Sequence, residues 1–321
     1  MSPVYKKPRA PDAAYQFTVL TPTFNRAHTL PRVYQSLTEQ SFQGFEWLII
    51  DDGSTDDTAE LVRQWQQEAS FPIVYHWQEN QHKKVAFNQG VQRARGELIV
   101  ALDSDDQLLV DALYGMARIW WSIPDELREQ FVGVTGLCQY PDGNVVGDLF
   151  PYDALDTNAL DLFFKYKVRG EKFGCLDRRV LLQFPFPEYA GFVPESLVWR
   201  AIARAGYKQR FVNQVFRVYH LGAQTLSAEG RTSRRHAMGL WLLAQDTLAA
   251  CMPWFDNAPK EFFYAAARYV RFRLHMWVQG QIPPKRPAKL GVWAKGLVTL
   301  MAPVGVLLFI RDSLRWRKAK P

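Results

Sequence analysis

Three carboxylates crowd one short stretch of the sequence, LIVALDSDD, in which five mostly apolar residues lead directly into Asp103, Ser104, Asp105 and Asp106. Like charges this close repel one another, and their burial is costly. Capping of a following helix accounts for one or two of the acids, and we assign Asp106 to that task. A divalent cation accounts for the others, because Mg²⁺ and Mn²⁺ bind carboxylate oxygens and bridge them to phosphate. We therefore favour a metal site for an anionic substrate.

Three other polar loops also follow apolar runs: TPTFNR (21–26), DDGSTDD (51–57) and NQHKK (80–84). Asp51 and Asp52 stand where a strand should end, and a carboxylate there can accept hydrogen bonds from a ribose or a base. Helix capping is the alternative, and it suffices for the later acids of the same loop. Neither a calcium-loop spacing nor a glycine-rich dinucleotide or P-loop motif is present.

Lys83 and Lys84 stand where a helix should begin. Solvated lysines are the commonest outcome for such residues. The functional alternative is that one of them pairs with a diphosphate, assisted by the N-terminus of the helix.

The elements that must position these loops alternate regularly. Apolar runs at residues 17–20, 45–50, 72–77 and 98–102 are separated by segments with helical spacing. This alternation predicts βαβ units and a parallel sheet, and the continuous apolar character of the runs predicts a sheet covered on both faces. Ligands bind beyond the carboxyl ends of such strands, so the four polar loops should converge on one edge. The helical segments are residues 28–40, 55–68, 83–95 and 108–121.

The alternation of apolar runs and helical segments ends near Phe131. Two runs joined by PDGN, residues 131–140 and 144–150, predict a hairpin. Residues 155–166 and 195–206 have helical spacing, and residues 210–219 read as a strand.

Composition narrows the classes of protein. The chain has 321 residues, and its three cysteines are far apart and form no CxxC pair, which favours a reducing compartment. The beginning of the sequence lacks the apolar run of a secretory signal, so we expect a cytoplasmic protein. The net charge of +7 is concentrated from Lys285 onward, where nine Lys/Arg face one acid. The rest is near neutral, and a nucleic-acid partner is not indicated.

Together, the four loops resemble the motifs of the family 2 glycosyltransferases, a large inverting family with a nucleotide-diphospho-sugar-binding α/β domain. Residues 21–26 look like the family's T/S-x-x-x-N-R loop, residues 50–56 like its V/I-D-D-G-S-T-D segment and residues 80–90 like its N-x-G-K-x-x-A-x-N-x-G segment. Asp103-Ser104-Asp105 looks like its D-x-D. The resemblance covers about residues 16–220, and His82 departs from it because the family usually has glycine there.

The resemblance implies a mostly parallel nucleotide-binding sheet flanked by helices, of glycosyltransferase A type, with a helical C-terminal extension. We expect a disordered lead-in (1–15) and a glycosyltransferase domain (16–228), followed by a helical region with a basic apolar tail (229–321). Within the domain, residues 16–130 would form the nucleotide-sugar half and residues 131–228 the acceptor half.

The resemblance also implies the site residues. One or more metal ligands among Asp103, Asp105 and His220 would bind Mn²⁺ or Mg²⁺ on the diphosphate, although a partly buried, satisfied His220 is the simpler alternative. The donor would be a nucleotide-diphosphate sugar, with UDP-sugars favoured. Its nucleotide would be bound by Thr21, Pro22, Thr23, Asn25, Arg26, Asp51, Asp52, Lys83, Asn88, Asp103 and Ser104.

An inverting transfer needs one carboxylate to take the proton of the acceptor hydroxyl. Glu195 follows Pro194 and should begin a helix, although spacing alone equally supports a favourable first-turn acid. The resemblance of residues 193–199 to the family's V-P-E-x-L-x-W favours Glu195, with Ser196 where many relatives have aspartate. The other candidates are Glu171, Asp177 and Glu188.

The tail, residues 290–310, contains one charge, Lys295, and one proline, Pro303. It is at the length limit for a membrane-spanning helix, but a charge in the bilayer is costly and the proline should break the helix. We favour a basic helix at the membrane surface, covering residues 289–321, over a helix packed on the body of the protein.

These features predict a metal-dependent inverting glycosyltransferase that acts on a glycan or lipid-linked acceptor in cell-surface polysaccharide synthesis, at the inner face of the membrane. A nucleotidyltransferase that forms nucleotide sugars would want a glycine-rich basic loop after the first strand, where only Arg26 is basic. A non-catalytic nucleotide-sugar or glycan-binding module would tolerate the loss of Asp105 or of the base, and neither is lost. A membrane scaffold protein leaves the four loops unexplained.

Overall fold

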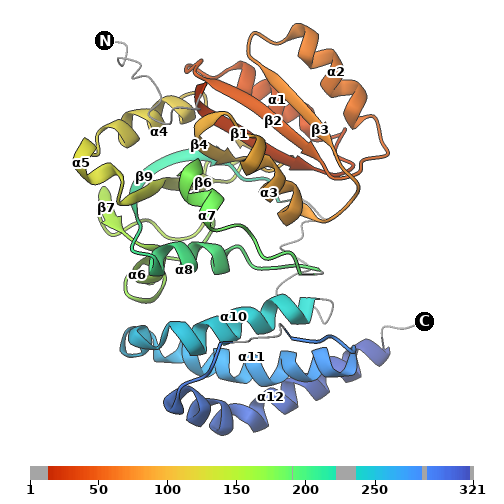
Figure 1. The fold of residues 1–321 in the computed structure, drawn as a ribbon, viewed down its shortest axis with the longest axis vertical. Coiled ribbons are helices and arrows are strands. Elements are labelled where there is room, and N and C mark those ends of the chain that lie inside the picture. Colours follow the sequence, from red (N-terminus) through yellow and green to blue (C-terminus); the bar gives the residue numbers. More distant parts are fainter. Residues whose placement is uncertain (1–13, 190, 222–235, 284–287, 319–321) are drawn as a thin grey trace. The chain divides into compact units, whose positions relative to one another are not determined.

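The computed structural model describes residues 14–189, 191–221, 236–283 and 288–318. The chain divides into two compact units (Figure 1). The first contains residues 1–162, 166–186 and 201–222, and the second contains residues 163–165, 187–200 and 223–321. The domain limits expected from the sequence stay predictions, because the boundary after residue 228 and most of the lead-in lie outside the described residues.

Half of the sheet in the first unit is built from the four predicted strands. In the order β3-β2-β1-β4 these strands run parallel. Every residue of β2 is buried, and Trp47 lies fully inside the core, because helices cover both faces of the sheet (Figure 1). The elements are β1 (Tyr15–Thr23), β2 (Phe45–Asp51), β3 (Ile73–Trp77) and β4 (Gly96–Ala101), with α1 (Leu30–Thr38), α2 (Thr58–Glu68), α3 (Lys83–Arg93) and α4 (Ala112–Trp121).

In the other half of the sheet three strands, β5, β7 and β8, run in the opposite direction to the rest. Strand β8 is antiparallel to both β4 and β6, and β9 is parallel to β6. Strands β4, β6 and β9 therefore end at the same edge as β1 to β3, and β8 begins there. The sheet is mixed rather than uniformly parallel. Its remaining strands are β5 (Gln107–Leu108), β6 (Phe131–Gln139), β7 (Ala154–Thr157), β8 (Lys172–Asp177) and β9 (Lys208–Val218).

Two predictions for this half are wrong in part. The predicted hairpin after β6 is reduced to a turn with one isolated bridge, Gln139 to Val145, because β8 and β9 already occupy the two sides of β6. Residues 154–157 form β7 instead of the start of a helix, because they pair with β9, and tertiary pairing outweighs local propensity. Short helices complete this part of the chain: α5 (Asp125–Arg128), α6 (Ala159–Phe164), α7 (Arg178–Gln183) and α8 (Ser196–Arg204).

The second unit is mainly helical, with α10 (Ala237–Ala250), η2 (Met252–Asn257), α11 (Pro259–Val278) and α12 (Val292–Lys318). Helix α12 continues through Pro303, so the prediction that this proline breaks the helix is wrong. Packing against α11 offsets the cost. A Cβ added to Gly305 would lie 2.7 Å from the carbonyl oxygen of Ala267, which shows how closely the helices approach. Asp312 accepts hydrogen bonds from Arg271 Nε at 2.6 Å and from His275 Nε2 at 3.0 Å.

Candidate functional site

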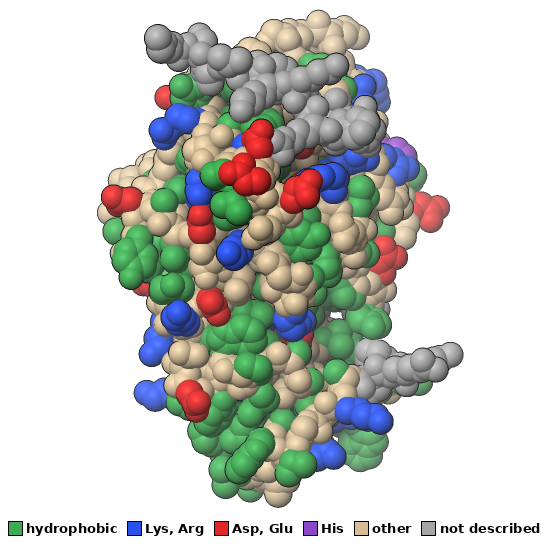
Figure 2. Space-filling view, turned by 60° about the vertical axis from the view of Figure 1, so that its left-hand side comes forward, with side chains coloured by type: hydrophobic (Ala, Val, Ile, Leu, Met, Phe, Trp, Pro, Cys, Tyr) green, Lys and Arg blue, Asp and Glu red, His purple; other side chains and the backbone are tan. Residues whose placement is uncertain are grey.

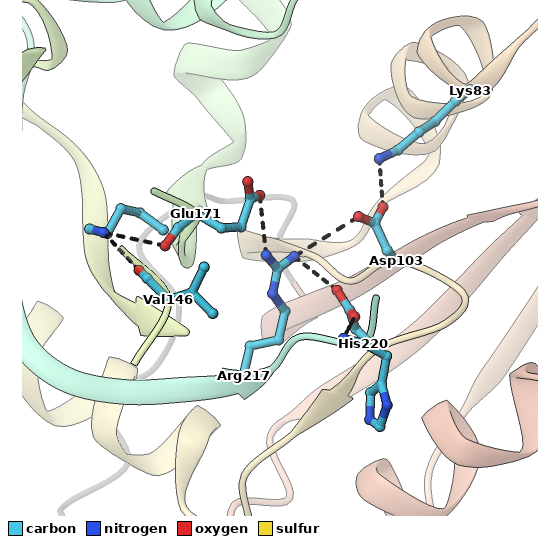
Figure 3. Close-up of polar contacts among 8 residues, drawn as sticks. Lys83, Asp103, Val146, Glu171, Arg217 and His220 are labelled. Atoms are coloured by element: carbon cyan, nitrogen blue, oxygen red, sulfur yellow. Dashed lines mark hydrogen bonds and ion pairs between the residues drawn. The ribbon is translucent and has the colours of Figure 1, made fainter. Parts of the chain in front are cut away.

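The loop after β4 meets the start of α3 at the carboxyl edge of the sheet. Lys83 is the first residue of α3, and its Nζ lies 2.6 Å from Asp103 Oδ1 (Figure 3). The contact follows from topology, because α3 leads into β4 and its N-terminus therefore lies at the edge where β4 ends. The structure thus brings together two of the loops that the sequence singled out.

The two acids of the D-x-D segment have opposite electrostatic surroundings. Burial alone would raise the pKa of Asp103, but the attraction of Lys83 and Arg217 outweighs it and lowers that pKa. Burial and the neighbouring charge of Asp103 raise the pKa of Asp105. Of these two acids, Asp105 has the less compensated charge, although Arg26 and Lys83 oppose the rise of its pKa. Two hard carboxylate groups, one of them only partly compensated, fit a divalent cation.

Arg217, near the end of β9, contacts three carboxylates at this edge. Only 3% of its side chain is exposed, and its guanidinium lies 3.2 Å from Asp106 Oδ2, 3.9 Å from Asp103 Oδ2 and 3.1 Å from Glu171 Oε1 (Figure 3). The rings of Phe173 and Tyr219 lie 4.7 and 5.3 Å from its carbon Cζ. An arginine held by three carboxylates and two rings has a single orientation.

Asp106 has a different role from the one expected. It is buried, and its Oδ1 accepts a hydrogen bond from the backbone N–H of His220 at 2.9 Å, while α4 begins only at Ala112. The prediction that Asp106 starts a helix is therefore wrong. Burial raises its pKa to about 7, although Arg217 opposes the rise. The feature of the sequence that could have indicated the contact between Asp106 and Arg217 was Arg217 itself, a charged residue in a partly apolar predicted strand.

The loops after β1 and β2 are fastened to each other through Asn25. Its backbone φ is +52°, its N–H donates to Ser54 Oγ at 2.8 Å, and its Oδ1 accepts from Thr55 N–H at 2.8 Å. Thr23, at the end of β1, is buried, and its hydroxyl has no hydrogen-bond partner within the described chain. A buried hydroxyl without a partner is costly. A nucleotide contact by Thr23 stays a prediction.

Asp51 and Asp52 are both buried and already hydrogen-bonded. Asp51 accepts from Ser54 N–H at 2.8 Å and from the Tyr75 hydroxyl at 2.6 Å, while burial and the Asp51 charge raise the pKa of Tyr75. Asp52 Oδ1 accepts from the side chain of Gln78 and from the backbone of Gln81, both at 2.8 Å. These acids hold the ends of β2 and β3 in place, and a nucleoside contact by either stays a prediction.

Other predicted nucleotide contacts have structural partners. Thr21 Oγ1 accepts from Trp47 Nε1 at 3.0 Å, and Pro22 is buried within β1. The Asn88 amide makes two 2.9 Å hydrogen bonds with the backbone of Phe186. A direct nucleotide contact by Asn88 would require it to leave Phe186. Ser104 is buried, and Arg26, at the same edge, contributes to lowering the pKa of Asp103.

His220 does not join the acids. Its imidazole points away from Asp103 (Figure 3), and its Nε2 lies 2.9 Å from Gln107 Oε1. In the part of the chain that the structure describes, no three His, Cys, Asp or Glu side chains are arranged to hold a metal ion. The set of Asp103, Asp105 and His220 is therefore not assembled, and liganding by His220 would need its ring to turn.

The candidate bases lie in different places. Asp177, at the far end of β8, caps α7 through Arg179 N–H at 2.8 Å, and its register with Leu98 places it at the edge opposite the D-x-D segment. Glu188 and Glu195 are exposed residues of the second unit, and Glu195 directly precedes α8. Glu171 lies beside Arg217 at the carboxyl edge. The choice of Glu195 stays a prediction.

The backbone at His82 has a conformation that suits the glycine of the family pattern, which this chain replaces with histidine. Its φ of +73° and ψ of +152° belong to a region that is essentially restricted to glycine. A glycine would adopt this conformation without strain. Lys83, the next residue, contacts Asp103.

Comparison with known proteins places this site in context. Residues 18–122 match the model of "Glycosyl transferase family 2". The chain is 26% identical over 235 residues to GalNAc(5)-diNAcBac-PP-undecaprenol beta-1,3-glucosyltransferase of Campylobacter jejuni, covering 71% of this chain and 72% of that protein. S. aureus TarS in complex with UDP-GlcNAc superposes with a TM-score of 0.58 at 17% identity, covering 92% of this chain and 81% of that one. PcManGT from Pyrobaculum calidifontis, in complex with GDP-Man and Mn²⁺, has a TM-score of 0.51 at 17% identity, covering 94% and 84%. At these identities the solved structures establish the fold alone.

Proposed function

The chain is a glycosyltransferase of family 2 with the glycosyltransferase A fold, and on that premise we propose that it moves a sugar from a nucleotide-diphosphate donor to a glycan or lipid-linked acceptor, with inversion. UDP-sugars are the favoured donors, and cell-surface polysaccharide synthesis is the favoured setting. The UDP-GlcNAc complex of TarS and the undecaprenol-linked substrate in the name of the Campylobacter relative support these choices.

The observation that carries the proposal is the meeting of Lys83, Asp103 and Asp105 at the carboxyl edge of the sheet. Lys83 supplies a cation for a phosphate at the start of α3, where the helix N-terminus also favours negative charge. The Thr23 hydroxyl, which is buried and has no partner among the described residues, lies at the end of β1 on the same edge. Asp103 and Asp105 would hold Mn²⁺ or Mg²⁺. When bound, such a cation would stabilise the negative charge of the leaving nucleotide.

Glu195 is the proposed general base. As an exposed carboxylate it would accept the proton of the acceptor hydroxyl as the oxygen attacks the sugar carbon. The bond from that carbon to the diphosphate then breaks, and inversion follows because attack and departure occur on opposite faces.

We also propose peripheral membrane contact through residues 289–321, at the inner face of the membrane. Within the described residues, Val292–Arg315 is one helix long and apolar enough to cross a membrane. Its outward side is apolar: Trp293, Leu300 and Leu307 are 84%, 65% and 66% exposed. Figure 2 shows hydrophobic side chains gathered over the helical unit, with Lys and Arg beside them. The pairing of Asp312 with Arg271 and His275 favours a helix that stays on α11 and lies along the membrane surface.

Thermal shift of the full chain with nucleotide diphosphates, with and without Mn²⁺, tests the donor site. We expect UDP to raise the melting temperature, and Mn²⁺ to increase that rise. Absence of stabilisation by every nucleotide diphosphate would refute the donor site. Stabilisation without any transfer or hydrolysis of a UDP-sugar would favour a binding module.

A further inference from the structure

We propose that Glu171 binds the hydroxyl groups of a sugar in this site. The inference rests on the proposed function, and it adds a sugar-recognition residue that no motif in the sequence indicated. Carboxylates are strong acceptors for hydroxyl donors, and a charge-assisted hydrogen bond is shorter and stronger than a neutral one. The sugar is either the one on the donor or the one on the acceptor, and the experiment below separates the two.

Topology brings Glu171 to the correct edge. It directly precedes β8, which starts at the edge where β4 ends, because β8 pairs antiparallel with β4. In the turn before Glu171, two segments of backbone pack closely against each other. Gly170 has a φ of +90°, and a Cβ on it would lie 2.5 Å from the Cα of Gly147. This packing fixes where the chain enters β8 and hence where Glu171 stands.

Arg217 then fixes the carboxylate itself. Its guanidinium lies 3.1 Å from Glu171 Oε1 and 3.9 Å from Asp103 Oδ2, so one planar group separates Glu171 from the D-x-D segment (Figure 3). Because Arg217 is 97% buried by these carboxylates and by aromatic rings, Glu171 receives a rigid partner. Glu171 thereby loses little further conformational freedom when it binds a ligand.

The remaining oxygen of Glu171 is available. Oε1 accepts the Arg217 hydrogen bond, whereas Oε2 makes no hydrogen bond or ion pair within the described residues, and 45% of the side chain is exposed. Figure 3 shows this second oxygen directed away from the guanidinium. Glu171 therefore has one carboxylate oxygen fixed by Arg217 and a second that can accept a hydrogen bond from a hydroxyl group.

The simpler explanation is that Glu171 only neutralises Arg217. Asp106 and Asp103 already lie 3.2 and 3.9 Å from the same guanidinium, so Arg217 has two other carboxylate partners. Neutralising Arg217 therefore does not require Glu171.

The test uses the full chain with Glu171→Ala, and with Glu126→Ala as a control because Glu126 is an exposed glutamate of the same unit. Calorimetry gives the affinities for UDP and for a panel of UDP-sugars. Titration of the UDP-loaded protein with a panel of methyl glycosides gives the affinity for a free sugar. We expect Glu171→Ala to leave the UDP affinity and the melting temperature unchanged, and to weaken binding of a sugar by about tenfold or more.

The pattern of loss identifies the source of the hydroxyls. Loss confined to UDP-sugars assigns Glu171 to the donor sugar, and loss confined to methyl glycosides assigns it to the acceptor. An equal loss of UDP affinity would mean that Glu171 acts through Arg217 on the nucleotide site, which overturns the proposal, as would unchanged binding of both sugar classes. Failure of the wild type to bind any nucleotide diphosphate would instead refute the proposed function.

Discussion

Replacement of Lys83 by methionine gives the most direct test of the phosphate site. The change keeps the length of the side chain and removes the charge that lies 2.6 Å from Asp103. A hydrogen bond to a charged group contributes about 1.5–3 kcal/mol, and Lys83 is 40% exposed, so we take the lower end, about 1.5 kcal/mol, to allow for screening. That free energy corresponds to an affinity for UDP about tenfold weaker.

Stability should change much less than affinity. The Lys83–Asp103 pair is partly exposed on both sides, and such pairs contribute about 0–1 kcal/mol. The assay is calorimetric titration with UDP at fixed Mn²⁺, paired with thermal unfolding of the same samples.

Arg93→Met provides the matched control. It removes a cation from the last turn of the same helix, about 15 Å from Lys83 at 1.5 Å per residue, and should not change the UDP affinity. An unchanged affinity in Lys83→Met, or an equal loss in Arg93→Met, would refute the argument that Lys83 contacts the diphosphate.

Three further predictions concern the base, the loop before α3 and the tail. Glu195→Gln should reduce transfer by about 100-fold or more while UDP binding survives, since it removes a general base and leaves the donor site intact; retained transfer would move the role to another acid. His82→Gly should raise the midpoint of denaturant unfolding, because strain of about 1–3 kcal/mol is relieved at a cost of about 0.5–1 kcal/mol in chain entropy; a lower midpoint would mean that the histidine side chain stabilises the loop. Leu300→Gln with Leu307→Gln should weaken sedimentation with anionic vesicles without lowering the melting temperature, because both side chains are exposed; unchanged sedimentation would favour a helix that only packs on α11.

The first half of the fold could be predicted because its signals are local. Strands β1, β2 and β4 are continuous apolar runs, each ending in polar residues, and the helix between each pair has helical spacing. The family resemblance and the glycosyltransferase A fold are likewise confirmed. The residues that bind one loop to the next, such as Asn25 to Ser54, depend on distances that no spacing rule gives.

The second half could be predicted less well because its pairings are long-range. Strand β8 pairs Cys175 with Val100 and with Val134, which lie 75 and 41 residues earlier in the chain. No pattern within residues 172–177 indicates which strands those partners are. For the same reason the sequence did not indicate that Glu171 contacts Arg217, which comes 46 residues later.

The three acids after β4 differ in how strongly neighbouring groups compensate their negative charges. Asp103 is compensated by Lys83 and Arg217, which lower its pKa, and Asp106 has Arg217 and the His220 N–H as partners. Among the described residues Asp105 has no such ion pair, and burial and Asp103 raise its pKa against the opposing charges of Arg26 and Lys83. If the protein needed Asp103 and Asp105 only for folding, the less compensated Asp105 would be a net cost, because a partly buried charge without an ion-pair partner is unfavourable. The carboxylate of Asp105 is therefore the one that a bound cation would stabilise most. Asp105→Asn should accordingly abolish the Mn²⁺-dependent part of the UDP thermal shift and leave the metal-free part in place.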